Sequence, residues 1–199
     1  MPTNSCLFFA HYHCEDRFRL VDQNSTRKPS PESALLSDLE YTLYVVAHGF
    51  WRWQTHCAQA AGVRNLGALD IQVLHTVNHR ARDKHLADIC LVLNITERHT
   101  VTYCLRKLQA AGLVEYEQAG RDRTYRATAS GDAFCARYRQ VREEFLLRVL
   151  GRDGADFAAM ESITSSLISL ARSYEEAGRA VTIASSAKSI GLGTAQSPR

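Results

Sequence analysis

Long apolar runs are missing from this sequence. Charges interrupt every hydrophobic stretch of the 199 residues well before the roughly 18 residues that a membrane-spanning helix needs. The N-terminal stretch MPTNSCLFFAHYHC has no basic lead-in and no small-residue cleavage site, so it does not resemble a secretion signal. We therefore expect a soluble, cytoplasmic protein without a membrane partner.

Motifs of catalysis are missing as well. There is no glycine-rich phosphate loop, no nucleophile elbow, and no Cys/His pair in a recognisable setting. The six cysteines lack the tight spacing of a disulfide scaffold, which indicates free thiols. Cys6, His11, His13 and Cys14 are close enough to suggest zinc, but they lack the paired loops that usually supply four tetrahedral ligands. We expect no enzyme, no cofactor and no metal site.

Charge of one sign does not dominate either. The net charge of +3 is weakly basic and cannot by itself indicate a nucleic-acid partner, so any such argument must be local. A chain of this length with 45% hydrophobic residues suffices for one core with helical extensions, and it is too short for two full domains.

The N-terminal third predicts a flexible arm over residues 1–30, followed by a long helix over residues 31–62. Ser30, Pro31 and Glu32 form a typical helix start. Apolar residues then recur every three or four positions, at Leu36, Leu39, Leu43, Val46, Phe50, Trp53 and Cys57. At roughly 40 Å this helix is longer than most helices of a small domain, so we expect it to pack against a partner as a dimerisation helix.

The rest of the chain predicts a mainly α fold with one small hairpin. Residues 67–128 contain three helical patterns and two short strands, 113–118 and 123–128, around a turn with Gly120. Thr96 is placed to cap the third of these helices. Further helices over 129–177 carry apolar stripes, one from Phe134 to Val149 and one from Met160 to Tyr174. The Ser-, Ala- and Gly-rich residues 178–199 predict a flexible tail.

Residues 97–111 project onto a helical wheel with two distinct faces. Val101, Cys104, Leu105 and Leu108 share the apolar face. The other face offers groups that donate to bases or phosphates, as a helix in the DNA major groove does. Its predicted DNA-binding residues are Arg98, His99, Thr100, Thr102, Tyr103, Arg106 and Lys107.

The hairpin that follows is basic at its tip, GRDR, because the acids Glu115 and Glu117 fall at its base. A helix, a turn, a second helix and a basic hairpin together predict a winged helix-turn-helix that binds double-stranded DNA, with Arg121 and Arg123 as wing contacts. The alternatives are a solvated amphipathic helix with an incidental hairpin, or an adaptor that binds protein through the same surfaces.

HTVTYCLRKLQAAGLVEYE, the basic hairpin and ATASGDAF resemble the recognition helix, wing and following helix of the MarR family of winged-helix transcriptional regulators. The resemblance covers about residues 67–150. It implies that Thr100 begins the groove-reading segment and that Arg121 is the wing-tip arginine. It also implies a homodimer whose first and last helices form the interface, reading a roughly palindromic operator.

Two further clusters have alternative interpretations. His48, Trp51, Arg52 and His56 could form a pocket for a small aromatic or anionic effector; the interpretation that we prefer is aromatic packing at the dimer interface. Cys57, Cys90, Cys104 and Cys135 could act as a redox switch, but Cys90 and Cys104 fall on apolar stripes, which favours packing for these two.

Overall fold

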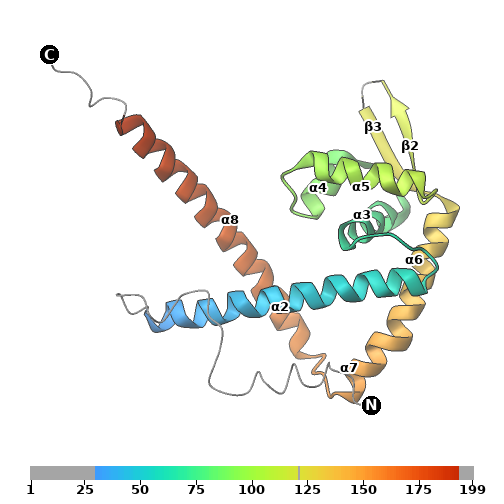
Figure 1. The fold of residues 1–199 in the computed structure, drawn as a ribbon, viewed down its shortest axis with the longest axis horizontal. Helices are drawn as coiled ribbons and strands as arrows, with labels where there is room; N and C mark the ends of the chain where they lie inside the picture. The colour runs from blue at the N-terminus through green and yellow to red at the C-terminus, as the bar shows by residue number, and fades with distance from the viewer. Residues whose placement is uncertain (1–29, 121, 193–199) are drawn as a thin grey trace. The chain divides into compact units, whose positions relative to one another are not determined.

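The computed structural model describes residues 30–120 and 122–192 (Figure 1). The predicted arm therefore lies, apart from Ser30, outside the described residues. The same holds for the zinc candidates Cys6, His11, His13 and Cys14 and for the wing-tip Arg121. The chain divides into two compact units, Met1–Leu146 and Leu147–Arg199.

Helix α2 (Pro31–Ala60) opens the first unit at the predicted position. The Ser30 hydroxyl accepts a hydrogen bond from the Ser33 amide at 3.2 Å, and Pro31 occupies the first helical position. The helix ends before Gly62, whose φ of 96° is a conformation that glycine adopts without strain. The C-terminal part of α2 is buried in the lobe that follows, at Gln54, Cys57 and Ala58.

A compact lobe follows α2. Its helices are α3 (Ala68–Asn78), α4 (Leu86–Val92), α5 (Arg98–Ala110) and α6 (Ala129–Val141), with a 3₁₀ turn, η2 (His79–Ala81), after α3. Its strands are β1 (Lys84–His85), β2 (Val114–Ala119) and β3 (Asp122–Ala127), which form an antiparallel sheet in the order β1-β3-β2. Figure 1 shows the β2–β3 hairpin projecting beside α5. This is a winged helix-turn-helix, mainly α, as the sequence predicted.

The core of the lobe consists of the apolar faces that the helical periods indicated. Ile71, Leu74, Leu105, Leu108 and Phe134 are almost completely buried, and Val77, Val101 and Cys104 are buried with them. Burial of this apolar surface is the main force that holds the helices together. Gly131 packs so closely on the backbone just before β2 that a Cβ atom there would collide with the Leu113 carbonyl oxygen. The position therefore requires glycine.

One strand of this lobe was not predicted, and one local prediction was wrong. Strand β1 was not predicted, because two residues carry no alternation pattern. Thr96 does not cap α5: Glu97 occupies the cap position, and the Thr96 hydroxyl donates instead to Glu97 Oε2 at 2.8 Å. By contrast, α6 does have a side-chain cap, because the Thr128 hydroxyl accepts a hydrogen bond from the Gly131 amide at 3.1 Å.

The helix after the hairpin is less regular than its stripe indicated. After α6 the backbone forms a π-helical segment, η3 (Arg142–Leu147), and then a short helix, α7 (Arg148–Arg152). The second unit is dominated by α8 (Ala159–Leu192). The prediction of a flexible tail from residue 178 was therefore wrong over 178–192, whereas residues 193–199 lie outside the described chain. None of the described helices has the length and apolar character to cross a membrane.

Candidate nucleic-acid interface

Helix α5 separates its side chains as the helical wheel predicted. Val101, Cys104, Leu105 and Leu108 are buried. Arg98, His99, Tyr103 and Arg106 are exposed, and Tyr103 retains 68% of its accessible surface. This exposed face combines guanidinium, imidazole and phenol groups, which can donate to base edges and phosphates.

The two predicted threonines of α5 are less available than these residues. Thr100 and Thr102 are half-buried. The Thr102 hydroxyl donates to the Arg98 carbonyl oxygen at 2.9 Å, a bond within the helix.

Lys107 does not take the place that the helical wheel gave it. Its Nζ lies 2.6 Å from Asp70 Oδ2 on α3, and the Asp70 side chain is only 6% exposed. The same carboxylate oxygen accepts the Gly67 amide at 2.8 Å and so caps α3. Lys107 therefore joins α5 to α3, which leaves its ammonium less available to DNA than the exposed arginines of α5, and its contact with DNA stays a prediction.

The wing arranges its two described arginines differently. Arg126 Nε lies 2.8 Å from Glu115 Oε1, and the Glu115 hydrogen bond raises the pKa of Arg126. Arg123 instead donates from Nε to Gln118 Oε1 at 2.8 Å, and its guanidinium carbon lies 4.8 Å from the centre of the Tyr116 ring. Both of these partners of Arg123 are uncharged, and no carboxylate in the described part of the chain forms an ion pair with it.

Sequence reasoning identified Arg123 but missed the two residues that orient it. Gln118 and Tyr116 lie on β2, five and seven positions before Arg123, and antiparallel pairing of β2 with β3 brings them together. A strand register of Gln118 opposite Arg123 could have indicated this pair, since side chains of directly paired residues lie on the same face of a sheet.

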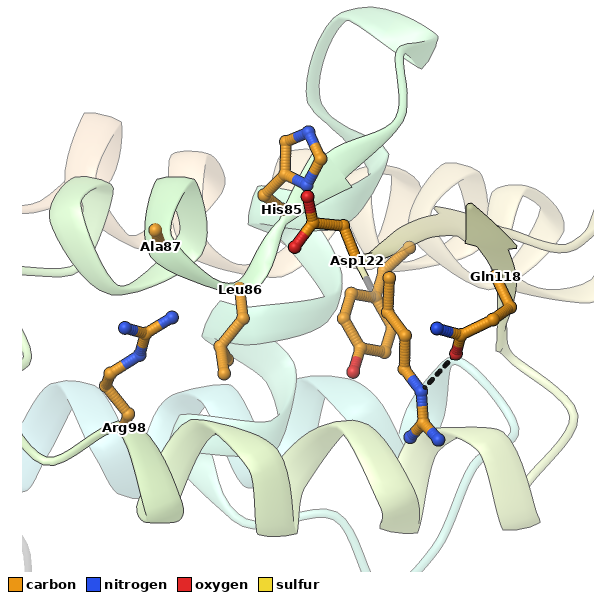
Figure 2. A pocket seen from close by; sticks show the side chains of 8 residues that line it. His85, Leu86, Ala87, Arg98, Gln118 and Asp122 are labelled. Atoms are coloured by element: carbon orange, nitrogen blue, oxygen red, sulfur yellow. Dashed lines mark hydrogen bonds between the residues drawn. The ribbon is translucent and has the colours of Figure 1, made fainter. Parts of the chain in front are cut away.

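A cavity of about 650 Å³ lies between the wing and the helix-turn-helix (Figure 2). Its lining residues come from the start of α4, the first turn of α5 and the hairpin: His85, Leu86, Ala87, Arg98, Gln118, Asp122, Arg123 and Tyr125. Arg98, His85 and Arg123 bring three basic side chains to one concave surface, with Asp122 as an acid among them. The structure thus places the first residue of α5 and the wing on a single concave surface.

The candidate effector residues lie elsewhere, on α2. His48, Trp51, Arg52 and His56 are all exposed. The His48 and Trp51 rings meet edge to face with 5.1 Å between their centres. The cavity beside the wing and a smaller one at α4 are lined by other residues. Both interpretations of this cluster stay predictions.

The four described cysteines are buried. Burial raises the pKa of the Cys104 thiol to about 12 and that of Cys135 to about 11, and it also raises the pKa of Cys57. A thiol of raised pKa holds little reactive thiolate at neutral pH. Packing is therefore the role that the structure supports for these residues.

Comparison with known proteins agrees with this geometry. Residues 66–131 match the family model of a winged helix DNA-binding domain. NMB1585, a MarR family regulator from Neisseria meningitidis, has a similar structure at 20% identity, with a TM-score of 0.56 over 72% of this chain and 95% of that chain. No curated protein matches the chain.

Two further solved structures are similar in fold. A mutant MarR from E. coli complexed with operator DNA gives a TM-score of 0.56 at 18% identity, covering 67% of this chain and 95% of that chain. CouR from Rhodococcus jostii RHA1 bound to p-coumaroyl-CoA gives a TM-score of 0.53 at 17% identity, covering 69% of this chain and 94% of that chain. The winged-helix fold of MarR-type regulators is therefore the fold of this chain.

Proposed function

We propose that this protein is a MarR-type transcriptional regulator, located in the cytoplasm, that binds double-stranded DNA through α5 and the wing. The observation that carries the proposal is the cavity beside the wing, where Arg98 of α5 and Arg123 of the wing line one concave surface. A relative of the same fold was solved in complex with operator DNA, which supports this partner.

In the proposed complex, α5 enters the major groove. Arg106 is exposed and can donate two hydrogen bonds to a guanine. His99 and Tyr103 lie on the same exposed face, where they can contact bases or phosphates, and Thr100 and Thr102 mark its edge. Arg98, Arg123 and the predicted tip residue Arg121 would meet the backbone beside it.

We propose further that the protein acts as a homodimer. In the described unit, α2 leaves Leu36, Leu39, Val46 and Phe50 at least 40% exposed. Helix α8 leaves Met160, Ile163, Leu167 and Tyr174 exposed at a spacing of three, four and seven residues. A stable monomer rarely leaves stripes of this kind in water, and a second copy of the chain would cover them. Two α5 helices related by a twofold axis would then read a palindromic site.

Capture of genomic fragments by the purified protein tests this function. The fragments should share a roughly palindromic sequence with half-sites about one helical turn apart. Arg106→Ala should reduce enrichment of that sequence while the protein remains folded. Fragments without any shared sequence, together with no binding to duplex DNA at low salt, would contradict the proposal.

The second candidate function is a winged-helix adaptor that binds protein through the same surface. The observation that favours it is the exposure of Leu91 and Val92 at the end of α4, at 81% and 67%, since exposed apolar side chains are typical of protein contacts. Salt dependence separates the two functions, because only phosphate contacts release condensed counterions. For the regulator, an effector site at His48, Trp51, Arg52 and His56 stays the alternative to aromatic packing at the dimer interface. CouR, of similar fold, was solved with p-coumaroyl-CoA.

A further inference from the structure

The segment that follows α3 and runs through β1 carries positive charge that neither α5 nor the wing supplies. Residues 79–85 read HRARDKH, with three Arg or Lys residues, two histidines and a single acid. Arg80 and Arg82 are exposed. Within residues 30–120 and 122–192, no carboxylate forms an ion pair with either guanidinium. Both charges are therefore free to meet an anion.

Lys84 holds this loop in place from within. Lys84 is only 4% exposed. Its Nζ donates to the His79 carbonyl oxygen at 2.6 Å and to the Arg82 carbonyl oxygen at 2.8 Å. Burial lowers the pKa of Lys84, with a further contribution from nearby Arg82. A buried ammonium is stable only when hydrogen bonds replace its water, so these two bonds fix the backbone on either side of Arg80.

The conformation of Arg80 is itself unusual. Its φ is 62°, in the left-handed region that residues other than glycine, asparagine and aspartate seldom adopt. The one acid of the loop, Asp83, faces the sheet, where its Oδ2 accepts a 3.4 Å hydrogen bond from the Thr124 hydroxyl. The loop thus directs its acid toward β3 and leaves its arginines in solvent.

This basic loop, residues 79–85, is continuous with the proposed DNA surface. His85 ends the loop and lines the wing cavity together with Arg98 and Arg123. Figure 2 shows His85, Arg98 and Gln118 around the same cavity. Strand β1 pairs with β3, so the loop enters the sheet on the side opposite β2.

We propose that Arg80 and Arg82 bind phosphates of the DNA segment that flanks the site covered by α5 and the wing. This inference rests on the proposed function and extends it, because it adds a third element to the contact surface. Contacts to phosphate carry no base information, so the loop would add affinity without changing which sequence is preferred.

The test is the salt dependence of binding to a fluorescein-labelled duplex of mixed sequence. The variant Arg80→Asn/Arg82→Gln removes both charges, and asparagine tolerates the positive φ at position 80. The control Arg172→Gln/Arg179→Gln removes two charges from exposed positions of α8. The slope of log affinity against log salt concentration should fall in the Arg80→Asn/Arg82→Gln variant and not in the control. The decrease should be about 0.9 for each phosphate that the protein no longer neutralises, and about two such phosphates are expected per protomer. Arg82→Gln alone, which leaves position 80 untouched, should give about half this decrease.

Duplex length tests where the contact lies. Shortening the duplex from both ends should weaken the parent more than the Arg80→Asn/Arg82→Gln variant, since the flanking phosphates are then absent for both. A parent that binds duplex DNA while the loop variant keeps the slope and affinity of the control would overturn this inference alone. A parent without salt-dependent binding would overturn the proposed function as well.

Discussion

The Nζ atom of Lys107 lies 2.6 Å from Oδ2 of Asp70, which joins the proposed recognition helix α5 to α3. The Asp70 carboxylate is nearly buried and also caps α3 at the Gly67 amide. A charge-assisted bond of this kind fixes how α5 is rotated against the core. The exposed face of α5 therefore depends on a residue 37 positions earlier in the chain.

We predict that Lys107→Met lowers stability without changing the salt dependence of DNA binding. The substitution leaves the Asp70 charge buried and unpaired, which should cost on the order of 1–3 kcal/mol. Asp70→Asn/Lys107→Met should recover part of this loss, because asparagine can still accept the Gly67 amide. Urea unfolding measures the stability. If Lys107→Met were stable and its slope of log affinity against log salt concentration were lower by about 0.9, Lys107 would contact a phosphate.

The two wing arginines should differ in kind. Arg123→Gln is expected to lower the slope of log affinity against log salt concentration by about 0.9, since the partners of Arg123 among the described residues, Gln118 and Tyr116, are uncharged. The control Glu115→Gln/Arg126→Gln removes an ion pair and keeps the net charge, so it should leave the slope near that of the parent. Equal decreases in both variants would contradict the distinction.

His75 should make stability depend on pH. Burial lowers its pKa, followed by repulsion from Arg139, and no described group bonds its buried Nε2. The Tyr138 ring packs against it at 4.7 Å. As pH falls below about 6.5, the unfolded chain binds the proton first, so the folded state loses stability.

The variant His75→Phe keeps a ring beside Tyr138 and removes the titration. Thermal unfolding of parent and variant between about pH 7.5 and pH 5 measures the difference. The parent should lose more stability than the variant across this range. Parallel losses would show that His75 does not carry the effect.

Cys104 should act as a packing residue and not as a redox sensor. Cys104→Ala is expected to cost about 1 kcal/mol through a small buried void. Parent and variant should bind DNA equally well under reducing and oxidising conditions, since burial raises the pKa of this thiol to about 12. A redox-dependent affinity that disappears in Cys104→Ala would overturn the assignment.

The dimer prediction concerns the exposed apolar side of α2. Val46→Glu/Phe50→Glu places two charges on side chains that are 60% and 51% exposed, so the chain should fold and yet sediment as a monomer. Gln59→Glu, at an exposed position near the end of the same helix, is the control and should remain a dimer. A double variant that sediments as a folded dimer would exclude this face from the interface.

The spacing of apolar residues predicted the helices of the lobe well where the apolar positions of the sequence are the buried positions of the structure. The apolar and polar faces of α5 follow from the spacing of Val101, Leu105 and Leu108 alone. The role of Lys107 does not, because its partner Asp70 belongs to another helix and a helical wheel contains no tertiary contacts. Likewise, the orientation of Arg123 depends on the register of β2 against β3, for which the sequence analysis made no prediction.

The end of α8 was missed for a different reason. Serine, glycine and threonine over 178–192 resemble a linker in composition. In the structure, however, the hydroxyls of Thr182 and Ser186 donate to the carbonyl oxygens of Gly178 and Thr182 one turn earlier. Alanines between them have the highest helix propensity. Composition alone does not distinguish these two outcomes.

Site-specific crosslinking at Tyr103 tests the central claim most directly. Tyr103 is exposed on the face of α5 that we place in the DNA groove, and Phe157 is an exposed aromatic residue in the second unit. Each is replaced in turn by the photoreactive benzoylphenylalanine and irradiated with a labelled duplex from the captured genomic fragments. The account predicts a protein–DNA crosslink from position 103 and none from position 157. If the duplex crosslinked at neither position and position 103 crosslinked to protein instead, the DNA-binding account would be contradicted and the adaptor favoured.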